Sequence, residues 1–200
     1  MHFEHPDWST VHRPEWKSIL DERLPKDRPI HIIEVGCFEG RSTVWFADYL
    51  QYHNDSRMSC VDTWLGGEEI VRTNLGFDMP QVFRTFTDNI NEHSQRRKIF
   101  INVGPSDTAL CSYQKFYHGM VDFIYLDGSH TQRDTIADLV LAYMLLRKGG
   151  VIIVDDYKNN MQTGNPKLRP RDAVDFFVSS FENEIEFFVT RERQAVIIRK

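Results

Sequence analysis

Five short runs rich in β-branched residues alternate along this chain with segments of helical periodicity, and this alternation constrains the fold more than any other feature. The runs that we expect to form strands are 30–36, 58–62, 98–104, 121–127 and 151–156. The expected helices are 14–23, 42–52, 81–93, 106–117, 131–147 and 171–181. Strands that alternate with helices predict a parallel sheet covered by helices on both faces.

The C-terminal end departs from this alternation. Residues 184–190 and 194–200 are two apolar runs separated by three charged residues, a pattern that predicts an antiparallel hairpin. The predicted fold class is therefore α/β, a doubly wound Rossmann-like sheet of seven strands that is mostly parallel and ends in an antiparallel hairpin. We expect residues 1–28 to form a helical extension on the substrate side of a main domain that spans 29–200.

Composition excludes several classes of function. Lys and Arg number 24 against 29 Asp and Glu, and the resulting net charge of −5 argues against nucleic acid as the partner. The three cysteines form no CxxC pair, which argues against a disulfide framework or a zinc site and favours a reducing, cytoplasmic setting. The apolar runs are too short to cross a bilayer, and the first residues lack the apolar core of a signal peptide, so we expect no membrane partner.

The segment 34–42, which follows the first expected strand, has the sequence EVGCFEGRS. A phosphate-binding GxxxxGK[ST] loop fails here, because Val35 stands where the first glycine is needed and Arg41 where the lysine is needed. A GxGxxG dinucleotide fingerprint fails because Phe38 replaces the second glycine. The carboxylate of Glu39 would also repel a pyrophosphate. A nicotinamide dehydrogenase is therefore disfavoured.

A ligand with positive charge fits this segment better. S-adenosylmethionine carries a sulfonium and an ammonium group and no phosphate. Gly36 and Gly40 would let the backbone approach it closely, and Glu34 or Glu39 would face its cationic end. Asp62 ends the second expected strand, where it is placed to accept hydrogen bonds from two ribose hydroxyls. The alternative is a tight strand-to-helix turn that binds nothing.

Three further carboxylates fall at strand ends. Asp127 ends the fourth expected strand, and Asp155 and Asp156 end the fifth. Because the carboxyl ends of parallel strands meet at one edge, these side chains would repel one another without a cation. Oxygen ligands indicate Mg²⁺, with Mn²⁺ or Ca²⁺ as alternatives. Neighbouring strand residues point to opposite faces, so the pair can bind one ion only if the chain has begun to turn there; otherwise one of them caps the next loop.

The ordered motifs EVGCFEGRST, VDTW, GPS, FIYLDGSH and GGVIIVDDY resemble the class I S-adenosylmethionine-dependent methyltransferases. More narrowly, they resemble the metal-dependent O-methyltransferases of the macrocin type, which act on sugars, and of the catechol type. The resemblance runs from about 30 to 200. It implies that the main domain, 29–200, is a methyltransferase domain.

The resemblance also implies the roles of single residues. The methionine part of the donor would be lined by Glu34, Gly36, Gly40 and Ser42, the ribose held by Asp62, the adenine approached by Ser106 and Asp107, the metal held by Asp127, Asp155 and Asp156, and the acceptor deprotonated by His130. An imidazole suits the last role, because its neutral form accepts a proton near pH 7. The alternative for His130 is a solvent-facing residue at a helix start.

These observations predict an S-adenosylmethionine- and Mg²⁺-dependent O-methyltransferase. Its acceptor would be a small hydroxylated molecule, a sugar or glycosylated metabolite rather than a catechol. Two rivals stay open: a metal-independent methyltransferase acting on nitrogen or carboxylate, and a nucleoside-binding protein of the same fold without activity. The sequence leaves open the identity of the acceptor, whether the chain forms a homo-oligomer, and whether the glycine-bearing segment 63–80 is a lid or an ordinary loop.

Overall fold

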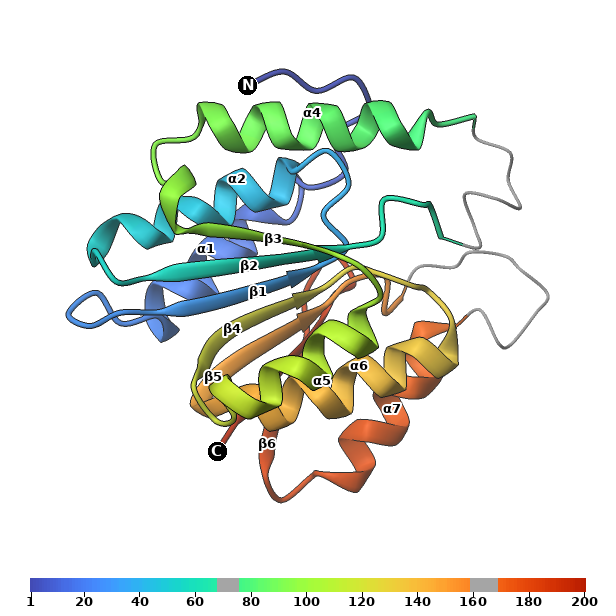
Figure 1. Ribbon diagram of the computed structural model, residues 1–200. Coiled ribbons are helices and arrows are strands. Elements are labelled where there is room, and N and C mark those ends of the chain that lie inside the picture. Colours follow the sequence, from blue (N-terminus) through green and yellow to red (C-terminus); the bar gives the residue numbers. More distant parts are fainter. Residues whose placement is uncertain (68–75, 159–168) are drawn as a thin grey trace.

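The computed structural model describes residues 1–67, 76–158 and 169–200 (Figure 1), and their strands form one sheet in the order β3-β2-β1-β4-β5-β7-β6. The first five strands run parallel, while β7 is antiparallel to β5 and β6 is antiparallel to β7. The predicted seven-stranded fold class is confirmed. The strands are β1 His31–Val35, β2 Arg57–Asp62, β3 Ile99–Val103, β4 Val121–Leu126, β5 Leu146–Val154, β6 Ile185–Val189 and β7 Ala195–Arg199.

The α-helices divide between the two faces of the sheet (Figure 1). One face carries α1 Arg13–Arg23, α2 Arg41–Ala47 and α4 Met79–Glu92, and the other carries α5 Ser106–Tyr117, α6 Gln132–Leu145 and α7 Pro170–Ser180. Two short 3-10 helices, η1 Asp48–Tyr52 and η2 Arg96–Lys98, follow α2 and α4.

The central strands β1 and β4 are buried on both faces, and most of their residues are therefore apolar. Along β1, Ile32 packs into the core under α1, α2 and α4, while Ile33 packs into the core on the opposite face. Along β4, Phe123 and Ile124 divide in the same way. Because alternate residues of a strand point to opposite faces of the sheet, each of these strands contributes side chains to both cores.

One boundary differs from the prediction. Helix α6 ends at Leu145 and β5 begins at Leu146, five residues before the expected start of that strand. Leu146 pairs with Val121 on β4, and the register then shifts before the next pair. The ion pair between Arg147 and the buried Asp122 lies at this irregularity. Pairing with a distant strand thus ends the helix earlier than its own periodicity indicates.

The N-terminal region contributes to the core. Trp16 and Leu20 of α1 are fully buried and belong to the same apolar cluster as the residues of β1 and α2. The hypothesised lid 63–80 lies partly outside the described residues, which omit 68–75.

Candidate active site

The candidate residues lie at the carboxyl edge of the sheet, where β2, β1, β4 and β5 are consecutive neighbours. Strand β1 pairs with β2 on one side and with β4 on the other, so the chain order reverses direction across the sheet at this point. In open α/β sheets such a position opens a crevice beyond the strand ends. Two groups of residues flank it: the β1 loop, residues 34–42, and the acidic edge, which consists of Asp127, His130, Asp155 and Asp156.

Two glycines shape the β1 loop. Gly36 has φ +81°, and a Cβ atom there would lie 1.8 Å from the carbonyl oxygen of Asp127. Gly40, at φ +84°, precedes the first turn of α2, and a Cβ there would lie 2.9 Å from the ring of Phe86. The left-handed backbone and the close contacts together require glycine at both positions. The β1 loop is thereby packed directly against the end of β4.

Glu34 and Ser42 are brought together inside the β1 loop. The fully buried carboxylate of Glu34 accepts hydrogen bonds of 2.5 Å from the hydroxyls of Ser42 and Thr43. Burial raises the pKa of Glu34 to about 7, although both hydrogen bonds favour the charged form. Glu34 therefore fixes the start of α2.

Asp62 organises the same loop from the end of β2. Its Oδ2 accepts hydrogen bonds from the amides of Cys37 at 2.8 Å and Phe38 at 3.0 Å, and its Oδ1 accepts one from the amide of Trp64 at 2.8 Å. The indole of Trp64 in turn donates to the carbonyl of Phe38. The carboxylate stands beside the β1 loop and holds that loop in shape, while its role toward a ribose stays a prediction.

Glu39 contacts the N-terminal segment. Its buried carboxylate accepts hydrogen bonds from the amides of Glu4 and His5 and lies 2.7 Å from Nδ1 of His5. The His5 ring also packs edge-on against Phe38 and Phe77. Glu34 and Glu39 are the two candidates for the cationic end of the donor. The contacts of Glu39 hold residues 4 and 5 against the β1 loop.

Ser106 and Asp107 begin α5, beyond the end of β3. The hydroxyl of Ser106 donates to Oδ2 of Asp138 at 3.0 Å, whereas Asp107 is exposed and caps the amide of Thr108. Asp138 lies on α6, and burial raises its pKa to about 7. The sequence analysis did not single out Asp138, which lies among the buried residues of α6 beside Leu139 and Ala142.

The acidic edge gathers its side chains from two strand ends. Nε2 of His130 lies 2.9 Å from Oδ2 of Asp156 and 3.8 Å from Oδ1 of Asp127. One ligand atom from each of these three residues falls within 4.8 Å of the others. Asp156 has φ +53°, so the chain turns immediately after β5 and the Asp156 side chain reaches His130. That Asp155 and Asp156 bind one ion stays a prediction.

Asp155 lies beside this group with its own partners. Its Oδ2 accepts a hydrogen bond from the hydroxyl of Tyr125 at 2.8 Å, and that hydroxyl is also 3.5 Å from Oδ2 of Asp127. Its Oδ1 accepts hydrogen bonds from Gln194 and from the amide of Asp156. Asp127 and Asp156 therefore both lie beside His130, and Asp155 is linked to Asp127 through the hydroxyl of Tyr125.

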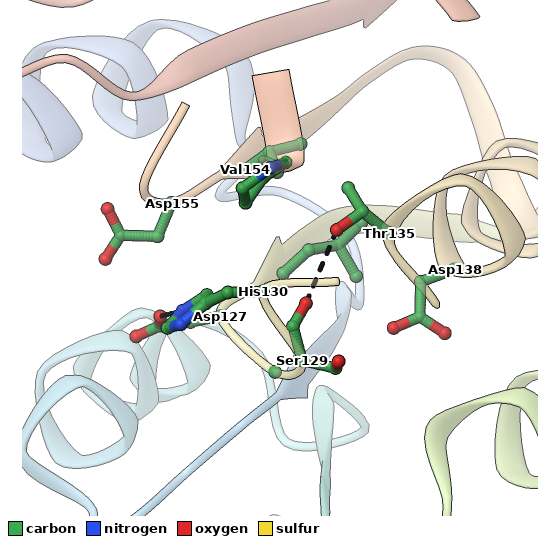
Figure 2. A pocket seen from close by; sticks show the side chains of 10 residues that line it. Asp127, Ser129, His130, Thr135, Asp138, Val154 and Asp155 are labelled. Carbon is green, nitrogen blue, oxygen red and sulfur yellow. Dashed lines mark hydrogen bonds and ion pairs between the residues drawn. The ribbon is translucent and has the colours of Figure 1, made fainter. Parts of the chain in front are cut away.

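Figure 2 shows this edge from close by, with Asp127 and His130 against each other and Asp155 on the neighbouring strand end. A small pocket here lies between the ends of β4 and β5 and the start of α6. It is lined by Leu126, Asp127, Gly128, Ser129, His130, Thr135, Asp138, Val154, Asp155 and Pro170.

The electrostatics of the acidic edge favour a cation. Burial and the nearby charge of Asp155 raise the pKa of Asp127 well above its usual range. Burial alone would lower the pKa of His130, but the carboxylates of Asp127 and Asp156 outweigh it and raise that pKa to about 11. A crowded set of carboxylate oxygens is the donor set that a hard divalent cation prefers, so the residues present fit Mg²⁺.

A second group of ligand-type side chains, Glu34, Cys37 and Cys60, lies under the β1 loop. Burial raises the pKa of both thiols. Metals bind the thiolate, so this group is a poor metal site and packs as part of the core.

The comparisons with known proteins agree with this geometry. A family model described as a methyltransferase domain matches residues 33–157. The rhamnosyl O-methyltransferase of Mycobacterium tuberculosis is 23% identical over 177 residues, covering 80% of this chain and 71% of that protein.

Solved structures share the fold. The O-methyltransferase NovP superposes with a TM-score of 0.70 at 19% identity, over 95% of this chain and 80% of that one. An O-methyltransferase from Bacillus cereus in complex with SAH superposes with a TM-score of 0.69 at 16% identity, over 97% and 83%.

Among the helices of the described residues, we find none with the length and apolar character needed to cross a bilayer. The β1 loop, the strand order and the family match over more than half of the sequence lead to one assignment: this chain belongs to the methyltransferase-domain family and is an S-adenosylmethionine-dependent methyltransferase of class I fold.

Proposed function

We propose that the protein is a Mg²⁺-dependent O-methyltransferase that transfers the methyl group of S-adenosylmethionine to a hydroxyl of a sugar or glycosylated metabolite. The observation that carries the proposal is the grouping of Asp127 and Asp156 around His130, with Asp155 linked to Asp127 through the hydroxyl of Tyr125, next to the β1 loop. The β1 loop, Asp62 and Ser106 would bind the donor. The named activity of the mycobacterial relative supports a sugar acceptor, as does likeness to a TDP-rhamnose 3'-O-methyltransferase, with a TM-score of 0.65 at 17% identity over 97% of this chain and 81% of that one.

In the proposed reaction a C–O bond forms while the C–S bond of the donor breaks, and the hydroxyl proton passes to Nε2 of His130. Charge is neutralised as the oxyanion meets the sulfonium, so orientation of the two reactants in a dry site supplies much of the acceleration, up to about 7–11 kcal/mol in favourable cases. The chain's own contribution is to hold the two reactants: the β1 loop on the donor side and the acidic edge on the acceptor side.

Asp127, Asp155 and Asp156 would hold the metal. When bound, Mg²⁺ supplies positive charge that favours the ionised form of the acceptor hydroxyl. That charge would offset the negative charge of Asp127 and Asp156, the two carboxylates that raise the pKa of His130. His130 would thereby return toward the neutral imidazole that a general base requires.

One observation favours a second candidate, a metal-independent methyltransferase. His130 already lies between Asp127 and Asp156 and, as an imidazolium, is their counterion without a metal. In that case the acidic edge would be a permanent ion-pair cluster and the acceptor would not need an activated hydroxyl. Treatment with EDTA separates the two candidates, because the metal-independent enzyme would stay active.

The test is a turnover assay that measures S-adenosylhomocysteine release with a panel of rhamnosides, nucleotide sugars and catechols, with added Mg²⁺ or EDTA. We expect turnover with a sugar hydroxyl and its loss in EDTA. Asp155→Ala should abolish activity while leaving S-adenosylmethionine binding intact by calorimetry. Equal loss of both would make Asp155 structural. Tight S-adenosylhomocysteine binding without turnover on any acceptor would instead favour a nucleoside-binding protein.

A further inference from the structure

A buried chain of hydrogen bonds runs from α1 to the acidic edge. The indole Nε1 of Trp16 donates to Oε1 of Gln194 at 2.7 Å. Nε2 of Gln194 donates to Oδ1 of Asp155 at 3.0 Å and to the hydroxyl of Tyr125 at 3.2 Å, and that hydroxyl donates to Oδ2 of Asp155 at 2.8 Å. Trp16 and Gln194 are fully buried, and Tyr125 is nearly so.

The chemistry of the groups fixes the direction of every bond in this chain. An indole N–H can only donate, so the oxygen of the Gln194 amide must face Trp16. The amide NH₂ must then face Asp155 and Tyr125. Because the Tyr125 hydroxyl receives one of these protons, its own proton is directed at Asp155. The amide of Gln194 cannot flip without leaving the buried Trp16 indole N–H without an acceptor and turning the amide oxygen toward the carboxylate of Asp155, a costly arrangement.

The same carboxylate also controls its neighbour. Oδ1 of Asp155 accepts a hydrogen bond of 2.8 Å from the amide of Asp156. Asp156 has the left-handed backbone at φ +53° that brings its side chain to His130. The orientation of the Asp155 carboxylate therefore also affects the position of Asp156.

We propose that Gln194 and Trp16 are positioning residues for the acidic edge, so that the affinity of the metal site depends on a glutamine in the β6–β7 hairpin and a tryptophan in the N-terminal helix. This inference rests on the proposed function, because it assigns a role toward the proposed metal. The two residues touch neither substrate nor metal; they act through Asp155, whose remaining lone pairs stay available to a cation.

The first test measures Mn²⁺ binding by electron paramagnetic resonance, which needs no turnover. Gln194→Met keeps the length of the side chain and removes the amide. Loss of partners that orient a ligand costs about 10- to 100-fold in metal affinity, and we expect a decrease of that size. Affinity for S-adenosylhomocysteine, measured by calorimetry, should stay within about twofold.

The matched control is Gln114→Met, which removes an amide that bonds to the Leu141 carbonyl between α5 and α6. It should leave Mn²⁺ affinity unchanged. Equal Mn²⁺ affinity in wild type and Gln194→Met would overturn the inference alone. A wild-type protein that binds no Mn²⁺ would overturn the proposed metal site, and this inference with it.

The second test is a titration of the wild-type protein, and a variant serves only to assign one resonance. The chain has four tryptophans, whose indole N–H resonances are followed in a ¹H–¹⁵N spectrum and of which Trp16→Phe identifies one. We expect Mg²⁺ addition to shift the Trp16 resonance with a saturable dependence. The resonance of Trp45, whose ring lies 5.5 Å from that of Trp16, should respond far less. A Trp16 resonance that ignores saturating Mg²⁺ would contradict the proposed coupling.

Discussion

The β1 loop and the acidic edge both present carboxylates at the same edge of the sheet, yet they treat them differently. In the β1 loop, Glu34 receives two hydroxyl donors, and Asp62, from the end of β2, binds that loop through two of its three amide donors. At the acidic edge, Asp127 and Asp156 both lie beside the imidazole of His130. The first region surrounds each carboxylate with hydrogen-bond donors, whereas the second places several carboxylates close to one another.

This difference separates two roles for acidic residues at strand ends. A carboxylate saturated by nearby donors fixes backbone geometry, because any movement breaks several hydrogen bonds. Carboxylates crowded together favour the arrival of a cation, because that relieves their repulsion. The sequence shows only an acidic residue at each strand end, and the donors around it decide which role it takes.

The largest expected effect follows from removing the imidazole of the acidic edge. His130→Gln should reduce kcat by about 10²- to 10⁴-fold, the usual contribution of a general base. Binding of S-adenosylmethionine should change little, because the β1 loop is untouched. Calorimetry and steady-state kinetics on the same preparation check both parts. Retention of full activity would exclude His130 as the base.

The next largest effect is expected at Gly36, where the β1 loop contacts the carbonyl of Asp127. Gly36→Ala would place a Cβ atom 1.8 Å from the Asp127 carbonyl oxygen at φ +81°. The left-handed strain and the overlap together should lower the free energy of unfolding by about 2–5 kcal/mol. Gly119→Ala is the matched control, since Gly119 has φ +68° with open space around it and should show only the strain, about 1–2 kcal/mol. Urea denaturation of both variants measures the difference, and equal losses would contradict the close packing at residue 36.

Glu34 in the β1 loop leads to a prediction about how the stability of the protein depends on pH. Burial raises the pKa of Glu34 to about 7 in the folded protein from 4.5, so the folded state holds a proton that the unfolded state releases. This contribution to stability is present below pH 4.5 and is lost as the pH rises through 7, with a magnitude of up to about 3 kcal/mol. Glu34→Gln should therefore lose less stability than wild type between pH 5 and pH 8, as measured by urea denaturation. Parallel pH profiles would place the titration elsewhere.

The smallest effect is expected at the N-terminal segment. Glu39→Gln keeps the shape of the side chain but weakens its hydrogen bonds to residues 4 and 5. Loss of charge-assisted hydrogen bonds should lower stability by about 1–3 kcal/mol without changing Mn²⁺ binding. Thermal unfolding with and without Mn²⁺ tests this independence of the two regions. A changed response to Mn²⁺ would show that the N-terminal segment also affects the acidic edge.

Much of the fold was predictable because its signals are local. Helix α5 has the predicted bounds, and the five parallel strands follow from short apolar runs. The start of β5 was predicted too late, because its first residue is held by a partner 25 positions earlier in the chain. The N-terminal segment could not be placed from sequence, because the acceptor for its amides, Glu39, lies 34 or 35 residues away.

The candidate site divides in the same way. The convergence of Asp127, Asp155 and Asp156 at one edge was predictable, since parallel strands bring their ends together and each carries an aspartate there. The partners of Asp155 were not predictable. Trp16 and Gln194 are separated by 178 positions, and a single sequence contains no signal that joins them.

The contact of Gly36 with the Asp127 carbonyl has a consequence for how such an enzyme diversifies. If the β1 loop holds the donor and the acidic edge holds the acceptor, as proposed, this main-chain contact fixes the distance between them, and a change of side chain does not lengthen it. The surrounding loops could then change and accept a different alcohol, while the distance over which the methyl group moves stays the same.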